Sequence, residues 1–181
     1  SELIFEDELV EVFTIPLEHR VYTNGFLFKE KPGDRKLNID AVQEEKIDIA
    51  YYRKLKQGFD VYNTDGILIK NESVTMDGRK PKSYAFCSDT AYKESIVPII
   101  NNVSVLYHES TFLEKHSHLA SKTKHSTAKE AARIAKQACV GKLILGHYST
   151  RYNDLNFFKV EAKEVFKNVE LAEDGKVFEF D

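Results

Sequence analysis

Aspartate and histidine residues at the ends of three predicted strands are the candidates for chemistry in this sequence. The segment Tyr84–Thr90 alternates residues as a strand does and reaches a carboxylate at Asp89. His19 follows the predicted strand 9–15 after a Pro-Leu-Glu sequence, and His147 follows an apolar run. Histidine and aspartate are good ligands for Zn²⁺ or Mn²⁺, and a shared carboxylate can bridge two ions. These strand ends could therefore hold a metal ion, although a lone histidine after a strand is more often an ordinary surface or core residue than a ligand.

A fourth histidine precedes the clearest predicted helix of the chain. Thr127 and Glu130 have the spacing of a capping box, so the helix begins directly after His125-Ser126. A helix N-terminus attracts anions and is expected to lower the pKa of His125. The alternative is a histidine that only fills space beside the cap. His116 and His118 are predicted to be exposed loop histidines without a site.

The elements around these residues indicate an α/β architecture. Predicted strands and helices alternate from residue 84 onward, and helices in that order cover one face of a sheet. The strands are expected at 9–15, 84–90, 103–107 and 142–145, and the helices at 91–101, 127–140 and 153–168. Asn24-Gly25 predicts a tight hairpin, a bulge or a kink, and Asp174-Gly175 predicts a hairpin within 169–180.

The segment 29–78 differs in composition from the rest of the chain. It lacks a strong apolar period, contains several turn signals, and has one predicted helix at 40–56. Its first part is basic, and the aromatic residues Tyr51, Tyr52 and Phe59 lie among the basic ones. Two interpretations follow: a solvated surface excursion, which composition alone favours, or an arm that contacts phosphates while its aromatic residues stack on bases.

The bulk composition indicates one globular protein with a real core. The chain has 181 residues, 42% hydrophobic and 30% charged residues, and a formal net charge of −3, so no global basic field marks a nucleic-acid binder. Cys87 and Cys139 lie in apolar runs and are expected to be buried reduced thiols of a cytoplasmic protein. No apolar run approaches the length of a membrane span, so we expect no membrane partner.

Four local motifs resemble one family. They are Phe86-Cys87-Ser88-Asp89-Thr90, His108-Glu109-Ser110-Thr111-Phe112, His125-Ser126-Thr127 and Leu145-Gly146-His147-Tyr148-Ser149-Thr150-Arg151-Tyr152. Their order and spacing resemble ribonuclease Z, a metal-dependent endonuclease of the metallo-β-lactamase fold that trims precursor tRNA at its 3′ end. The resemblance runs from about Leu9 to Phe180. His-Glu-Ser-Thr departs from the commoner His-Glu-Ala-Thr by one small residue.

The resemblance implies a role for each residue of the site. His19, Asp89 and His147 match metal ligands, with Asp89 as the bridging carboxylate. His125 matches the residue proposed to donate a proton to the leaving ribose oxygen, and Glu109 is expected to orient it.

The resemblance also implies the residues that contact the RNA. Ser149 and Arg151 resemble phosphate binders. The segment 31–69 matches an arm that holds the tRNA elbow, which reverses the preference from composition, and Arg53, Lys54 and Lys56 are its candidate RNA contacts. The Gly-Pro signature usual near the tip of this arm is not evident.

The implied fold is the C-terminal half of an αββα sandwich, with one mixed sheet covered by helices on one face. We expect residues 1–181 to form a single, partial domain with the arm inserted. The family motif H-x-H-x-D-H is absent from the sequence, which opens at Ser1, so the chain is expected to be a processed or excised piece. A complete site would hold two Zn²⁺, with Mn²⁺ or Mg²⁺ as alternatives. Three ligands are too few, and the isolated chain is expected to bind metal weakly and to be inactive.

The implied partners are precursor tRNA and a second copy in a homodimer. The uncovered sheet face of the isolated chain is expected to be apolar and to cause self-association. Two alternatives remain open: another hydrolase of this fold that acts on small phosphodiesters or sulfate esters, and a non-catalytic tRNA-binding remnant.

Overall fold

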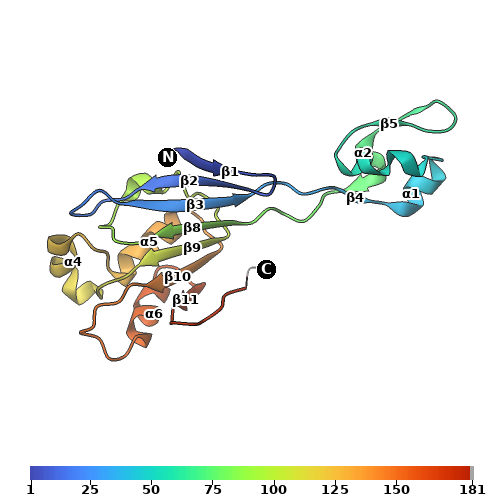
Figure 1. The fold of residues 1–181 in the computed structure, drawn as a ribbon. Helices are drawn as coiled ribbons and strands as arrows, with labels where there is room; N and C mark the ends of the chain where they lie inside the picture. The colour runs from blue at the N-terminus through green and yellow to red at the C-terminus, as the bar shows by residue number, and fades with distance from the viewer. Residues whose placement is uncertain (180–181) are drawn as a thin grey trace. The chain divides into compact units, whose positions relative to one another are not determined.

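The computed structural model describes residues 1–179 and divides into two compact units. We call Ser1–Glu30 together with the residues from Lys82 onward the sheet unit, and Lys31–Pro81 the inserted unit. Each is described by itself (Figure 1). Among the described residues, no helix has the length and apolar character of a membrane span.

A mixed, seven-stranded sheet forms the centre of the sheet unit. Its strand order is β1-β2-β3-β8-β9-β10-β11. The strands span Leu3–Glu6 (β1), Val10–Pro16 (β2), Asn24–Glu30 (β3), Ser83–Cys87 (β8), Val105–Glu109 (β9), Lys142–Gly146 (β10) and Val169–Leu171 (β11). Pairing is antiparallel from β1 to β8 and parallel from β8 to β11. The carboxyl ends of β8, β9 and β10 consequently lie at the same edge of the sheet.

Two helices pack on one face of this sheet. Helix α5 (Ala128–Gln137) contacts β9 and β10, and helix α6 (Asn156–Lys163) contacts α5 and β11 (Figure 1). The predicted capping box is present, because the Thr127 side chain accepts from the N–H of Glu130 while the Glu130 side chain accepts from the N–H of Thr127. The expected mixed sheet with helices on one face is confirmed.

The opposite face of the sheet presents a row of aromatic side chains. Phe26 pairs with Phe86, and Phe86 pairs with Tyr107, so these three residues share a face. The rings of Phe86 and Tyr107 stack with centroids 4.8 Å apart. Phe26 and Phe28 are 37% and 38% exposed. We call Phe26, Phe28, Tyr84, Phe86 and Tyr107 the aromatic face.

The inserted unit is built from short elements around a small core of its own. They are β4 (Lys36–Leu37), α1 (Ile39–Glu44), η1 (Ile49–Tyr51), α2 (Tyr52–Lys56), β5 (Val61–Tyr62), β6 (Leu68–Ile69), α3 (Asn71–Val74) and β7 (Thr75–Met76). The core consists of Val42, Ile47, Leu55, Val61, Ile69 and Val74. The single helix predicted at 40–56 is wrong, because the chain turns at Lys46 with a φ of 54°.

Asn24-Gly25 is not a hairpin turn. Both residues lie inside β3, where Gly25 pairs with Ile15, and a Cβ at Gly25 would overlap the carbonyl oxygen of Phe86. Close strand packing, not a turn, therefore requires this glycine. Leu3–Glu6 form β1, a strand that was not predicted from the sequence.

Three further predicted elements also differ. The helix at 91–101 is reduced to the 3₁₀ turn η2 (Glu94–Ile96). His116 and His118, expected in a loop, lie in η3 (Glu114–His116) and α4 (Ser117–Thr123). Of the hairpin at 169–180, only β11 forms within the described residues, where it pairs in parallel with β10, and Phe180 lies outside them.

Candidate functional site

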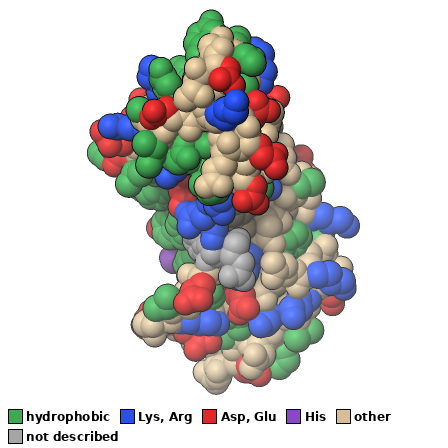
Figure 2. Space-filling view, turned by 90° about the vertical axis from the view of Figure 1, so that its right-hand side faces the viewer, with side chains coloured by type: hydrophobic (Ala, Val, Ile, Leu, Met, Phe, Trp, Pro, Cys, Tyr) green, Lys and Arg blue, Asp and Glu red, His purple; other side chains and the backbone are tan. Residues whose placement is uncertain are grey.

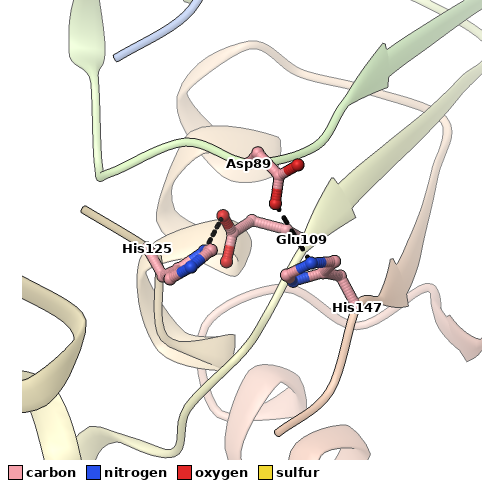
Figure 3. Close-up of side chains that lie close together, drawn as sticks. All are labelled: Asp89, Glu109, His125 and His147. Atoms are coloured by element: carbon pink, nitrogen blue, oxygen red, sulfur yellow. Dashed lines mark hydrogen bonds and ion pairs between the residues drawn. The ribbon is translucent and has the colours of Figure 1, made fainter. Parts of the chain in front are cut away.

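Four side chains converge at the sheet edge where the parallel strands end. Asp89 follows β8, Glu109 ends β9, His147 follows β10, and His125 precedes α5. One ligand atom from each lies within 4.8 Å of the others (Figure 3). The parallel order of the strands produces this convergence from residues distant in sequence.

Left-handed backbone conformations orient the side chains of Asp89 and His147. Asp89 and His147 both have a φ of 58°, a conformation that non-glycine residues adopt at a cost of about 1–2 kcal/mol. In each case the left-handed residue turns the chain just beyond the strand end. The Oδ1 atom of Asp89 consequently lies 3.0 Å from Nε2 of His147.

Glu109 is the buried centre of the hydrogen bonds in this site. Its side chain has no exposed surface, and Oε1 accepts from the Thr90 N–H at 2.6 Å and from Nδ1 of His125 at 2.8 Å. Oε2 accepts from the Thr111 hydroxyl at 2.6 Å and the Ser126 N–H at 3.1 Å. Burial opposes ionisation, but the hydrogen bonds from His125, Thr111 and Ser126 outweigh it and hold the pKa of Glu109 below its ordinary value.

His125 is held with one ring nitrogen toward Glu109. Because a carboxylate only accepts, Nδ1 is the donor in this pair. The hydrogen bond that His125 donates to Glu109 outweighs partial burial and raises the pKa of His125 above its ordinary value. The expected lowering of the pKa of His125 by the helix N-terminus is wrong, because the adjacent carboxylate has the larger effect.

His19 lies next to the group of four but is not part of it. Its Nδ1 is 2.8 Å from the carbonyl oxygen of Lys124, and its ring centroid is 4.9 Å from that of His125. The carbonyl accepts from Nδ1, so Nε2 keeps its lone pair. The role of His19 as a metal ligand stays a prediction.

Ser149 and Arg151, the expected phosphate binders, contact each other. Nε of Arg151 donates to Oγ of Ser149 at 3.2 Å, and the guanidinium lies 5.3 Å from the ring centroid of Phe112. The Ser149 N–H donates to the carbonyl of Thr111 at 3.1 Å. This loop is thus connected to the Thr111 backbone, next to Glu109.

Arg53, Lys54 and Lys56, the expected RNA contacts, all lie on α2 of the inserted unit. Nζ of Lys54 is 5.7 Å from the ring centroid of Tyr51. Lys56 lines a hollow of about 440 Å³ together with Asp34, Arg35, Lys36, Leu37, Ile39 and Tyr52. Hydrophobic and charged side chains are mixed on the molecular surface, as Figure 2 shows for one face.

Sequence reasoning missed the groups that surround Glu109. Thr90, Thr111 and Ser126 all donate to its carboxylate. His108 is also fully buried, with Nδ1 donating to the carbonyl of Glu109 at 2.7 Å and Nε2 without a hydrogen-bond partner among the described residues. The motif His-Glu-Ser-Thr contained the signal, since two of these residues flank Glu109 within it.

The donor set fits a metal ion. Oδ1 of Asp89 and Nε2 of His147 lie 3.0 Å apart, and both residues are ligand types of Zn²⁺ and Mn²⁺. His116 and His118 take no part in it, although His116 is hydrogen-bonded to the Tyr152 hydroxyl at 2.6 Å and is not a free loop histidine.

Solved structures identify the fold. The metallo-β-lactamase fold protein YhfI of Bacillus subtilis superposes with a TM-score of 0.63 and 20% identity, over 97% of this chain and 52% of that protein. The short form of human tRNase Z superposes with a TM-score of 0.56 and 20% identity, over 99% of this chain and 46% of that protein. The chain therefore has the architecture of the metallo-β-lactamase fold.

Proteins related in sequence indicate which group within this fold the chain resembles. A ribonuclease Z of Cytophaga hutchinsonii is 48% identical over 179 residues, which are 98% of this chain and 57% of the relative. A ribonuclease Z of Porphyromonas gingivalis is 47% identical over 165 residues, which are 91% of this chain and 54% of the relative. The chain spans about half the length of the curated relatives it matches, and no protein-family model matches it. Its resemblance to the C-terminal part of ribonuclease Z is confirmed.

Proposed function

We propose that this chain is the part of a metal-dependent endoribonuclease that supplies half of its active site, and that the complete enzyme cleaves precursor tRNA on the 3′ side. The observation that supports this most directly is the convergence of Asp89, Glu109, His125 and His147 at one sheet edge. The relatives named ribonuclease Z favour RNA over the small esters of other hydrolases of this fold.

Asp89, His147 and His19 would hold the metal, with Asp89 as the shared carboxylate. Zn²⁺ is the proposed ion, two in a complete site, with Mn²⁺ or Mg²⁺ as alternatives. Bound metal supplies an activated hydroxide and stabilises charge on the phosphate oxygens.

His125 is the proposed proton donor to the leaving ribose oxygen. Glu109 holds Nδ1, so Nε2 is the nitrogen that delivers the proton. Because the pKa of His125 is raised, the ring stays protonated up to a higher pH, and a proton donor at this step must be protonated.

The remaining predicted residues position the RNA in this proposal. Arg151, held by Ser149, places a planar guanidinium for a bidentate grip on phosphate. Arg53, Lys54 and Lys56 would contact the tRNA backbone from the inserted unit. The complete enzyme would act as a homodimer in the cytoplasm.

The isolated 181 residues are proposed to be inactive. They contain three candidate ligands in the roles assigned above and lack an H-x-H-x-D-H motif. Two ions need more ligands than this, so metal binding by the chain alone would be weak.

A hybrid protein tests the proposal. The 181 residues replace the matching part of the Cytophaga hutchinsonii relative, and we call this protein the hybrid enzyme. With Zn²⁺ or Mn²⁺, the hybrid enzyme is expected to cut precursor tRNA, Asp89→Asn is expected to abolish the cut, and the isolated chain is expected to leave the RNA intact. A folded hybrid enzyme that leaves the RNA whole contradicts the proposed activity, and cleavage by the isolated chain contradicts its proposed inactivity.

A further inference from the structure

Thr111 connects the two histidines of the site through the carboxylate of Glu109. Its side-chain oxygen lies 2.6 Å from Oε2 of Glu109 and 2.8 Å from Nδ1 of His147. The other carboxylate oxygen, Oε1, accepts from Nδ1 of His125. Thr111 is only 7% exposed, so solvent offers its hydroxyl few alternative partners.

The chemistry of these groups fixes the direction of each hydrogen bond. A threonine hydroxyl has one proton, and an ionised carboxylate can only accept. The Thr111 proton therefore points to Glu109, and the hydroxyl oxygen must accept from His147. Nδ1 of His147 then carries a proton.

This direction determines which nitrogen of His147 serves as a ligand. With Nδ1 committed to Thr111, the metal-binding lone pair belongs to Nε2. Nε2 lies 3.0 Å from Oδ1 of Asp89, so it is also the nitrogen that faces the other candidate ligand. Hydrogen bonds to the second nitrogen of a ligand histidine commonly set its orientation and tautomer.

We propose that Thr111 is a positioning residue that keeps the proton on Nδ1 of His147 and leaves Nε2 for the metal. Glu109 thereby fixes His125 directly and His147 through Thr111, so one buried carboxylate sets the orientation of both rings. This inference rests on the proposed function for its purpose, whereas the proton position can be measured without RNA.

Nitrogen NMR of the 181-residue chain at about pH 8 tests the proton position. In the unmodified chain, Nδ1 of His147 is expected to be protonated. Thr111→Val keeps the shape of the side chain but removes the acceptor, so the proton is expected to move to Nε2, where it can donate to Asp89. Thr111→Ser restores a hydroxyl and is expected to restore the proton on Nδ1.

A matched control separates this role from general loss of a buried hydroxyl. Thr75 of the inserted unit is also 7% exposed, and its hydroxyl donates to the Asn71 carbonyl at 2.8 Å and accepts from Nε of Arg35 at the same distance. Thr75→Val is expected to leave the His147 proton in place.

Titration with Zn²⁺ gives the second measurement. Thr111→Val is expected to weaken Zn²⁺ binding by roughly 10–100-fold, while Thr111→Ser stays close to the unmodified chain. An unprotonated Nδ1 in the unmodified chain overturns the proposal even if Thr111→Val fails to fold. A folded Thr111→Val chain whose His147 proton position and Zn²⁺ affinity are both unchanged also overturns the proposal. Failure of the hybrid enzyme to cut RNA bears on the proposed function and not on these measurements.

Discussion

Nδ1 of His125 lies 2.8 Å from Oε1 of Glu109, and the carboxylate in this pair is completely buried. A buried carboxylate is stable only when donors surround it, and Glu109 receives hydrogen bonds from residues 90, 111, 125 and 126. These donors come from three loops, two that follow β8 and β9 and one that precedes α5. Glu109 therefore orders the ends of the strands as well as orienting one histidine.

Replacing Glu109 with glutamine is expected to change how stability depends on pH. Folding lowers the pKa of Glu109. The stability that ionised Glu109 contributes is therefore present above pH 4.5, its ordinary pKa, and is lost as the pH falls through the lower pKa of the folded state. Folding raises the pKa of His125. The stability that protonated His125 contributes is therefore present below pH 6.5, its ordinary pKa, and is lost as the pH rises through the higher pKa of the folded state. The pair thus stabilises the chain most between these two limits.

Urea unfolding of the metal-free chain across this pH range measures the effect. Glu109→Gln is expected to lower the unfolding free energy by about 1–3 kcal/mol near pH 5.5, and to flatten its pH dependence. Glu72→Gln, an exposed change of equal charge in the inserted unit, is the control. An undiminished pH dependence in Glu109→Gln would show that the pair contributes little.

Removing the His125 ring tests its role as an acid. In the hybrid enzyme, His125→Ala is expected to slow cleavage of precursor tRNA by about 10²–10⁴-fold, the usual contribution of a proton donor. A substrate with sulfur in place of the leaving ribose oxygen needs no proton at that atom, and it should show a much smaller loss. His118→Ala, an exposed histidine of α4, serves as the control. An equal loss with both substrates would rule out proton donation.

Gly146 permits the close approach of an aromatic ring beside the site. A Cβ at this position would overlap the hydroxyl of Tyr107 on the neighbouring strand. Gly146→Ala is therefore expected to destabilise the chain by about 1–3 kcal/mol, as overpacking does. Tyr107→Val removes the ring, so the cost of Gly146→Ala should fall sharply in the double variant. Additive losses in urea unfolding would mean that the two residues do not conflict.

Patterns within single segments explain what the sequence predicted well. Apolar runs that end on Asp89 and His147 predicted β8 and β10, and the spacing of Thr127 and Glu130 predicted the start of α5. Each depends on neighbouring residues along the chain. The order of the strands was not predictable in this way, although α/β alternation indicated a sheet with helices on one face.

Features that depend on distant segments were not predictable from local pattern. Asn24-Gly25 has the composition of a turn, but the carbonyl of Phe86 on the adjacent strand requires a glycine inside β3. The pKa of His125 was expected to fall because only its own helix was considered, and the carboxylate of Glu109 reverses the direction. The hydroxyl of Thr111 has no sequence signal apart from its place in His-Glu-Ser-Thr.

The basic residues of α2 are expected to matter for large substrates only. In the hybrid enzyme, replacing Arg53, Lys54 and Lys56 with alanine should weaken tRNA binding and reduce the slope of log K against log salt by about 0.7–0.9 per lost phosphate contact. Hydrolysis of a small chromogenic phosphodiester should be unchanged. Lys46→Ala is the control, since Nζ of Lys46 is already paired with Asp65 at 2.9 Å. Equal loss on both substrates would contradict an RNA-binding role for the inserted unit.

The aromatic face is expected to make the isolated chain self-associate. Phe26 and Phe28 expose over a third of their surface beside the partly buried rings of Tyr84 and Phe86, and contiguous apolar surface of this kind drives association. Light scattering should therefore show species larger than a monomer, and replacing Phe26 and Phe28 with serine should shift them toward the monomer. Phe157→Ser removes a similarly apolar, 59% exposed ring from α6 and should have less effect. A monomeric unmodified chain, or association that persists unchanged in the double variant, would show that this face does not drive association.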